Sequence, residues 1–367
     1  MNYDNVLFIF LFALGISFLC APIIINMLYR FRVWKRKEYI QDIANQAQKK
    51  NTPIMGGLIF IVGVLITTLL FNRQREFTYV PLAVMMISAA LGFTDDMISI
   101  FGRGRAVKTL KDSFHAITGD YSFFHKLLQI LLIPWRAYAS LFSGFNSSDG
   151  KELFPHERIL VYLITGFIVA WWFYFKISWP TRDILWLPFG LSITIGWLMI
   201  PFIILVVFGT TVAVAITDGL DGLLASLSIP AFTAFGIIAT IQGSAPLALF
   251  CATMVGALFA YLYFNIKPAR IWMGDTGSVA LGATLATVAV LLNRPILILV
   301  VGLLFIIDFL SSTIQVYGVK IFHRRFLPYA PIHHWFEKIG WDESKIVMRA
   351  MIIAWVLAFI GVWLAFK

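Results

Sequence analysis

The stretch 212–227, VAVAITDGLDGLLASL, joins two long apolar runs through a short turn that carries Asp218 and Asp221. Runs of about 17–25 apolar residues are typical of membrane-spanning helices. Carboxylates are costly next to hydrocarbon and usually mark a function when they occur in such segments. The stretch therefore predicts two membrane spans joined by a turn that is either an ordinary helix connection or part of a site.

Composition extends this interpretation to the whole chain. Of its 367 residues, 60% are hydrophobic and 13% are charged, and the mean hydropathy is +0.84. Such a chain cannot present a soluble surface. We therefore predict an all-α polytopic membrane protein with about ten transmembrane helices. The apolar runs lie at about 6–29, 54–71, 78–94, 158–175, 187–215, 222–241, 245–264, 278–293, 295–316 and 347–366.

No internal repeat divides the chain, so residues 1–367 are expected to form a single membrane domain. One irregular segment, at about 97–157, is inserted between the third and fourth runs. Within it, residues 123–142 (FFHKLLQILLIPWRAYASLF) are amphipathic and interrupted by Pro134. This pattern favours a helix lying in the membrane interface over an eleventh span.

The uneven distribution of lysines and arginines predicts the orientation, because cytoplasmic loops carry an excess of both. With both termini outside, the loops near 30–53, 95–157, 216–221, 265–277 and 317–346 face the cytoplasm and hold most of the 29 basic residues. Topology thus explains the net charge of +10, and we expect membrane lipids but no nucleic acid as partners. The basic residues on the other side are Arg73, Arg75, Lys176, Arg182, Arg294 and Lys367.

Five aspartates lie at the ends of odd-numbered runs, and this topology brings all of them to the cytoplasmic face. Asp95 and Asp96 end the third run, Asp218 and Asp221 end the fifth, and Asp275 follows the seventh. Carboxylates at one depth repel one another unless a cation lies among them. Mg²⁺ suits them, because it takes oxygen ligands and shares its site with substrate phosphates. Each aspartate alone could be a helix cap, so the prediction of a cytoplasmic cleft rests on their shared face.

Two further elements offer contacts to a phosphorylated substrate. Residues 330–337, APIHHWFE, contain the pair His333 and His334. A zinc site needs more ligands than this neighbourhood supplies, whereas imidazoles that donate to phosphate oxygens fit the acidic cleft. Residues 49–57, KKNTPIMGG, place Lys49 immediately before the second run, where a proline and two glycines shape a tight entry.

Together these motifs resemble the phospho-N-acetylmuramoyl-pentapeptide transferases. The similarity is carried, in order, by TPIMGG, GFTDD, TDGLDGL, FNIKPARIWMGDTGS, IQV and APIHHWFE, and covers nearly the whole chain outside 97–157. It implies a Mg²⁺-dependent enzyme of the bacterial inner membrane with a cytoplasmic-face active cleft. Its reaction would transfer phospho-MurNAc-pentapeptide from UDP-MurNAc-pentapeptide to undecaprenyl phosphate, giving lipid I and UMP for peptidoglycan synthesis. A homodimer would be compatible with the resemblance.

The resemblance also implies roles for individual residues. Asp275 would be the principal Mg²⁺ ligand, with Asp218 as a second one. Asp95 and Asp96 would lie at the reacting phosphates together with Asp275 and His333. The substrate-binding residues would be Lys49, Asp218, Gly219, Leu220, Asp221, Asn265, Trp272, Gln315 and His334.

Several positions depart from the family pattern. Trp335 stands where a third histidine commonly follows the pair, and Ala215 replaces an asparagine upstream of the TDGLDGL motif. A lysine that usually precedes the fourth span has three candidate counterparts here: Arg158, Lys126 and Lys111. The carboxylates are unaffected by these changes, so we expect catalysis to be retained.

Three alternatives stay open at the level of sequence. One is a transferase acting on another UDP-N-acetylhexosamine, although the PIHH segment argues against it. A second is a cation-coupled secondary transporter, whose sites usually lie near the bilayer midplane rather than at helix ends. The third is a pseudoenzyme in which Ala215 and Trp335 signal lost activity.

Overall fold

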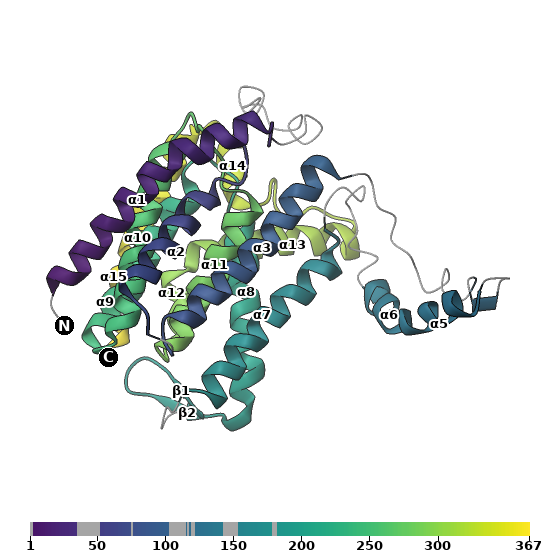
Figure 1. Cartoon of the computed structure of the whole chain (residues 1–367), viewed down its shortest axis with the longest axis horizontal. Helices are drawn as coiled ribbons and strands as arrows, with labels where there is room; N and C mark the ends of the chain where they lie inside the picture. The colour runs from purple at the N-terminus through teal and green to yellow at the C-terminus, as the bar shows by residue number, and fades with distance from the viewer. Residues whose placement is uncertain are drawn as a thin grey trace.

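A computed structural model describes residues 3–34, 52–74, 76–102, 115, 117–118, 122–141, 153–177 and 182–367 (Figure 1). Within these residues, nine helices are long and apolar enough to span a membrane, and a tenth apolar helix, α2, is shorter. Each of the ten predicted runs therefore contains one of these helices, and the all-α polytopic fold is confirmed. These helices are α1 (Tyr3–Arg30), α2 (Gly57–Phe71), α3 (Tyr79–Phe101), α7 (Pro155–Phe175), α8 (Met199–Ile216), α9 (Leu223–Ile241), α10 (Ala245–Asn265), α11 (Gly274–Leu291), α13 (Leu303–Phe322) and α15 (Glu343–Ala365).

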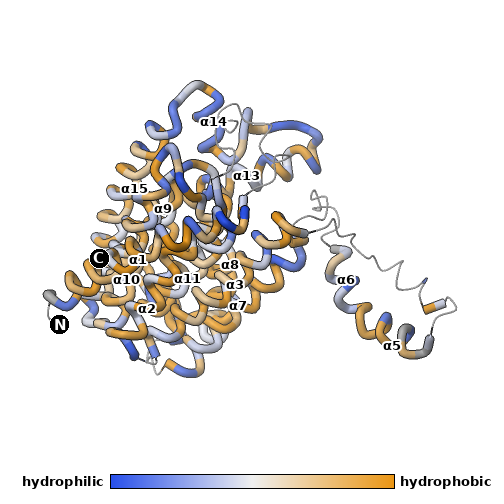
Figure 2. The backbone as a smooth tube through the Cα atoms, turned by 45° about the horizontal axis from the view of Figure 1, so that its top comes forward, coloured by the Kyte–Doolittle hydropathy of each residue, from blue (hydrophilic) through white to orange (hydrophobic). Residues whose placement is uncertain are grey.

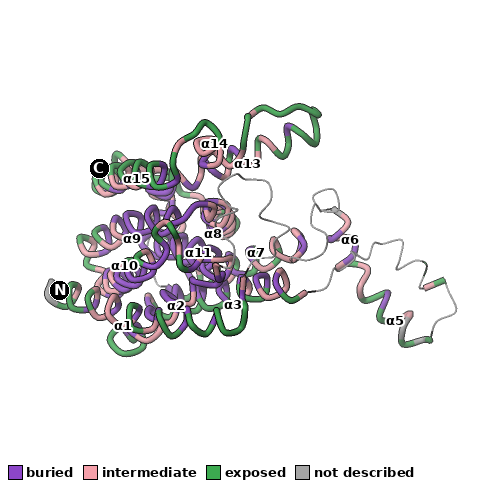
Figure 3. The backbone as a smooth tube through the Cα atoms, turned by 90° about the horizontal axis from the view of Figure 1, so that it is seen from above, coloured by how far each residue is buried: buried purple, intermediate pink, exposed green. Residues whose placement is uncertain are grey.

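Helix α11 forms the centre of the bundle. In its most apolar window 89% of the residues are buried, against 28% for the corresponding windows of α1 and α15. Its glycines, alanines and threonines allow neighbouring helices to approach closely. At one such contact, a Cβ on Gly92 of α3 would collide with the main chain of Asp275. Figure 3 shows the buried residues concentrated around α9, α10 and α11, with exposed ones on the outer helices.

Two predicted runs begin later than expected. In the run at 187–215 the helix starts only after a hairpin of β1 (Ile184–Trp186) and β2 (Ser192–Thr194) and a 3₁₀ turn, η4 (Gly196–Leu198). Phe189 and Gly190 both have positive φ at the hairpin turn, which hydropathy alone does not reveal. In the run at 295–316, η5 (Pro295–Leu297) and α12 (Ile298–Val301) precede α13, and the break falls at Gly302.

The inserted segment contains two short helices, α5 (Phe123–Leu131) and α6 (Ile133–Leu141). The single interrupted helix predicted there is thus divided just before Pro134, consistent with the missing N–H of proline. Neither helix is among the candidate spans of the described chain. The pair extends away from the bundle beside the start of α7 (Figure 1).

Both chain ends lie at the same end of the bundle (Figure 1), as an even number of spans requires. At the opposite end, α3 and α8 finish, while α7, α11 and α15 begin. The short helix α14 (Ile332–Lys338) also lies there. Figure 2 shows hydrophobic residues along the spans and more hydrophilic segments around α14. Of the residues predicted to form the cleft, those that the structure describes belong to this end of the bundle.

Candidate functional site

Asp96 binds the first turn of α11. Its Oδ1 accepts the N–H of Asp275 at 3.1 Å, and its Oδ2 accepts both the N–H of Thr276 at 2.9 Å and the Thr276 hydroxyl at 2.6 Å. The first N–H groups of a helix have no partner within the helix, and their positive end favours an anion. A buried carboxylate from α3 therefore fixes the start of α11, and with it the position of Asp275.

Asp95, on α3, faces Arg158, which lies in the first turn of α7. Arg158 Nη2 lies 2.5 Å from Asp95 Oδ2 and 3.8 Å from Asp275 Oδ2, so one guanidinium spans two carboxylates. The N–H of Leu153 donates to Asp95 Oδ1 at 2.8 Å. The side chain of Asp95 is 4% exposed, whereas that of Asp275 is 38% exposed. Of the two, Asp275 is the carboxylate accessible to a ligand.

Arg158 is thus the basic residue that enters the acidic cluster. Of its two rivals for the missing family lysine, Lys126 lies on α5, and Lys111 lies outside the described residues. A guanidinium remains charged at any working pH and can contact two oxygens at once. Asp95 and Asp275 therefore flank a permanent cation, and Asp96 lies next to Asp275 through the backbone N–H of that residue.

The TDGLDG turn is fastened to the loop between α10 and α11. Asp221 Oδ2 accepts the N–H of Ala269 at 3.1 Å, and its Oδ1 accepts the indole Nε1–H of Trp272 at 3.0 Å. Asn265 Oδ1 accepts the N–H of Gly222 at 2.9 Å, while its Nδ2 donates to the carbonyl of Ile271 at 2.8 Å. Asp221 and Asn265 thus hold the TDGLDG turn and the loop between α10 and α11 together.

Glu343, at the start of α15, supports the same turn from the other side. Its Oε1 accepts the N–H of Asp221 at 2.6 Å, and its side chain is completely buried. Lys267 Nζ lies 3.9 Å from Glu343 Oε2 and 2.6 Å from Asp342 Oδ1. The hydrogen bond from Lys267 holds the pKa of Asp342 below its usual range. Sequence reasoning missed Glu343, although a glutamate in the first turn of a span is a signal that it could have used.

His333 approaches the turn from α14. Its Nδ1 is 2.9 Å from Oδ2 of Asp308, on α13, and both side chains are buried. A Cβ on Gly219 would overlap the His333 imidazole, so glycine is needed for this approach. The buried Nε2 of His333 has no hydrogen-bond partner within the described protein. The carboxylate of Asp308 therefore orients the ring, and Nε2 lies against the backbone of Gly219.

The remaining predicted site residues are spread over several elements. His334 Nδ1 is 2.7 Å from Glu337 Oε2. Gln315 Oε1 accepts the N–H of Leu327 at 3.0 Å, so it shapes the loop after α13. Leu220 is buried, Asp218 is half-buried, and Lys49 lies outside the described residues.

The TPIMGG motif acts through its backbone. The N–H of Gly56 donates to the carbonyl of Trp272 at 2.7 Å, and the N–H of Trp272 donates to the carbonyl of Pro53 at 2.9 Å. The N–H of Gly57 donates to the carbonyl of Met273 at 3.1 Å. This motif therefore clamps the loop that carries Trp272 and leads to Asp275.

The donor set fits Mg²⁺ in type. Asp275 and Asp218 carry carboxylate oxygens, which are hard donors, and Mg²⁺ is commonly held by one or two carboxylates together with substrate phosphates. Among the described residues, no group of three or more His, Cys, Asp or Glu side chains forms a metal cage. A shared site of protein and substrate oxygens is the kind of site these residues can offer.

Replacing Glu343 by alanine is expected to release the TDGLDG turn. The buried N–H of Asp221 would lose its acceptor, which lowers the free energy of unfolding by about 1–3 kcal/mol. Glu343→Gln is the matched control, because an amide oxygen still accepts that N–H. Thermal unfolding in detergent, followed by tryptophan fluorescence, should separate the two variants. Equal midpoints would show that this hydrogen bond does not hold the turn.

Asp308 is expected to act through His333. Asp308→Asn removes the negative charge at Nδ1, and we expect kcat to fall by about 10-fold or more, as when carboxylates that orient imidazoles are lost. The double variant D308N/H333A should be no slower than H333A, because the effect of Asp308 requires the imidazole. Full additivity of the two losses would mean that Asp308 has a separate structural role.

Comparisons with known proteins show the family of the chain. Residues 137–293 match the family model described as glycosyl transferase family 4. The chain is 32% identical over 355 residues to a Clostridium perfringens phospho-N-acetylmuramoyl-pentapeptide-transferase, covering 95% of this chain and 96% of that protein. The proteins of the same name from Staphylococcus aureus (strain bovine RF122) and Clostridium novyi are 31% and 30% identical, each over 96% of this chain and over 97% and 94% of their own lengths. The chain therefore belongs to the phospho-N-acetylmuramoyl-pentapeptide transferase family.

Proposed function

We propose that this membrane protein transfers phospho-MurNAc-pentapeptide from UDP-MurNAc-pentapeptide to undecaprenyl phosphate, giving lipid I and UMP for peptidoglycan synthesis. The observation that carries the proposal is the meeting of Asp95, Asp275 and Arg158 at one end of the bundle. Phosphoryl transfer depends mainly on positioning and charge stabilisation. Fixed charges on three neighbouring helices, α3, α7 and α11, are suited to both.

In the proposed reaction, an oxygen of undecaprenyl phosphate attacks the phosphorus that bears the sugar. The bond from that phosphorus to the bridging oxygen breaks, and UMP leaves with the bridging oxygen. The attacking phosphate is already an anion near neutral pH, so little proton removal is needed. We therefore assign Asp95 mainly to holding Arg158, and Arg158 to stabilising negative charge on the transferred group.

Asp275 and Asp218 are the proposed Mg²⁺ ligands. When bound, Mg²⁺ supplies charge neutralisation at the diphosphate. The His333 imidazole, oriented by Asp308, donates from Nε2 to a phosphate oxygen when protonated. Trp272, held at its Nε1 by Asp221, offers an aromatic face on which a uracil ring can stack. The excess of lysines and arginines supports an orientation with this end of the bundle in the cytoplasm. The bacterial relatives support a location in the inner membrane.

Substrate choice tests the proposal directly. Purified protein in proteoliposomes with undecaprenyl phosphate and Mg²⁺ is offered either UDP-MurNAc-pentapeptide or UDP-N-acetylglucosamine, and UMP release is measured. Release with the first donor only is expected. Release with UDP-N-acetylglucosamine only would replace the proposed function by that of another sugar-1-phosphate transferase.

Removal of the metal is expected to stop the reaction. Excess EDTA should lower UMP release by about 10²-fold or more, because the diphosphate charge would lose its main counterion. Restoring Mg²⁺ should recover the rate, and Ca²⁺ serves as the control because its larger radius and looser coordination suit the site less well. Unchanged UMP release in EDTA would contradict the assignment of Asp275 and Asp218 as metal ligands.

A further inference from the structure

Helix α5 carries an apolar stripe that points away from the rest of the described protein. Its residues follow one another at helical spacing i, i+3, i+4 and i+7, which places them on one face. They are Phe124, Leu127, Leu128 and Leu131, with exposed fractions of 79%, 44%, 51% and 68%. Lys126 and Gln129 do not belong to this face, and Gln129 is buried. The helix is thus amphipathic with its apolar side outward.

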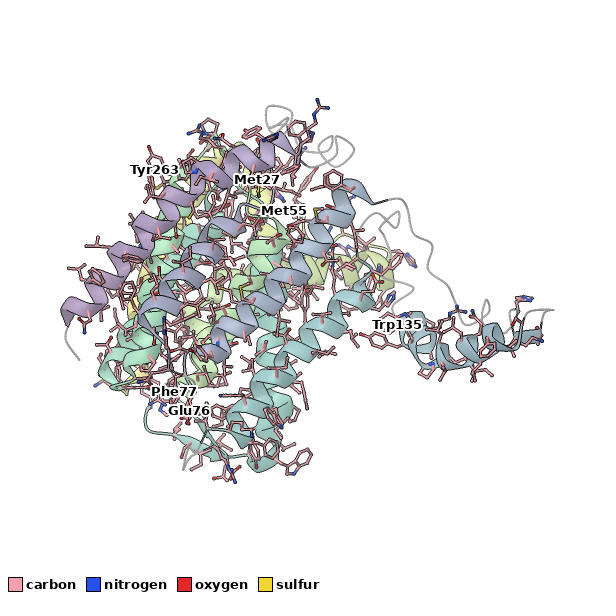
Figure 4. All side chains as sticks on the ribbon, in the orientation of Figure 1. Met27, Met55, Glu76, Phe77, Trp135 and Tyr263 are labelled. Atoms are coloured by element: carbon pink, nitrogen blue, oxygen red, sulfur yellow. The ribbon has the colours of Figure 1, made fainter. Side chains whose placement is uncertain are left out.

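Helix α6 fixes the pair to the first turn of α7. The Tyr138 hydroxyl donates to the carbonyl of His156 at 3.2 Å. The Trp135 ring lies 5.3 Å from the His156 ring, and Phe154 stacks on His156 at 5.6 Å. Figure 4 shows Trp135 reaching from α6 towards α7. Since His156 is two residues before Arg158, the pair is attached where a membrane span begins and beside the acidic cluster.

The attachment of the α5–α6 pair to α7 indicates which environment surrounds the apolar stripe. Helix α7 is a candidate span that starts at Pro155, so elements held to its first turn lie near the boundary between hydrocarbon and headgroups. Amphipathic helices lie in that boundary with the apolar face buried, and tryptophan and tyrosine favour the same depth. The eight residues from Phe124 to Leu131 extend only about 10 Å from first to last Cα. Four side chains over that length cannot supply the roughly 800 Å² per partner of a stable protein interface.

We propose that the α5–α6 pair is an interfacial anchor whose stripe, Phe124, Leu127, Leu128 and Leu131, inserts into the lipid leaflet at which α7 begins. The partner is the bilayer surface itself. Through Trp135 and Tyr138 the anchor also holds the turn of α7 that leads to Arg158. This inference does not rest on the transferase reaction.

Site-specific quenching tests the anchor. In a C20A/C251A background, a bimane label is placed at Leu131→Cys on the stripe or at Lys126→Cys off the stripe, in vesicles of phosphatidylglycerol and phosphatidylethanolamine. We expect nitroxide lipids to quench the label at 131 about twofold more than the label at 126, and aqueous iodide to show the opposite order. Each labelled protein must keep the thermal unfolding midpoint of its unlabelled parent.

Two results would overturn the proposal. Strong quenching by iodide at both positions would place the stripe in water. Weak quenching of the label at 131 by both iodide and nitroxide lipids would mean that protein covers the stripe, and energy transfer between labels on two molecules would identify a second copy as the cover.

Discussion

Asp275→Asn is expected to lower the rate of UMP release by about 10²–10³-fold, since it removes a charge that acts at the reacting phosphates. Its carboxylate is the partly exposed member of the cluster, lying 3.8 Å from Arg158. Its backbone N–H is held by Asp96, and asparagine keeps that bond. We therefore expect an unchanged unfolding midpoint together with the lost rate, and the Mg²⁺ concentration for half-maximal activity should rise.

The control is Asp183→Asn, which removes a carboxylate beside β1 at the opposite end of the bundle. Its activity should match that of the unsubstituted protein. Activity of Asp275→Asn within twofold of the unsubstituted protein would exclude Asp275 from the reaction. A lowered unfolding midpoint would instead show that the carboxylate is structural.

Arg158→Met is expected to destabilise the protein as well as to inactivate it. Asp95 would lose its cationic partner and keep the N–H of Leu153 as a donor while staying buried, and an unpaired buried charge is costly. Because Arg158 is 30% exposed, we expect a loss of about 2–3 kcal/mol, at the lower end of the range for broken buried pairs. Unfolding of the purified variant in detergent measures this loss.

The double variant R158M/D95N provides the control for charge. With Asp95 neutral, most of the lost stability should return, whereas activity should not, because the cation at the phosphates is still missing. If the double variant is no more stable than R158M, the loss arises from side-chain packing around Arg158 rather than from the ion pair.

Most of the fold could be predicted because lipid imposes a simple rule. A span needs a long apolar run, and each of the ten runs contains an apolar helix in the structure. The prediction of helix boundaries was wrong where apolar residues form a hairpin or a broken helix start instead of a continuous span. The hairpin before α8 and the broken start of α13 are as hydrophobic as helices, and their ends are set by positive φ and by a glycine break.

The acidic cluster could be predicted from topology, but the hydrogen-bond partners of each residue in it could not. Asp96, Asp221 and Asn265 hold backbone segments that are distant in sequence, and such pairings leave no local pattern. The same reason hid Asp308, which meets His333 from another helix. Arg158 was one of three candidates, since the inserted segment obscures the register and only the folded chain brings it to Asp95.

The fate of the sugar-bearing phosphate tests the central claim most directly. UDP-MurNAc-pentapeptide labelled with ³²P in that phosphate is incubated with the purified protein, undecaprenyl phosphate and Mg²⁺, and the mixture is extracted with butanol. The proposed reaction predicts that the label moves into the lipid fraction as one UMP is released per labelled lipid, and that Asp275→Asn abolishes both. Label that stays in the aqueous fraction, as UDP or as free sugar phosphate, would contradict phosphoryl transfer at this site.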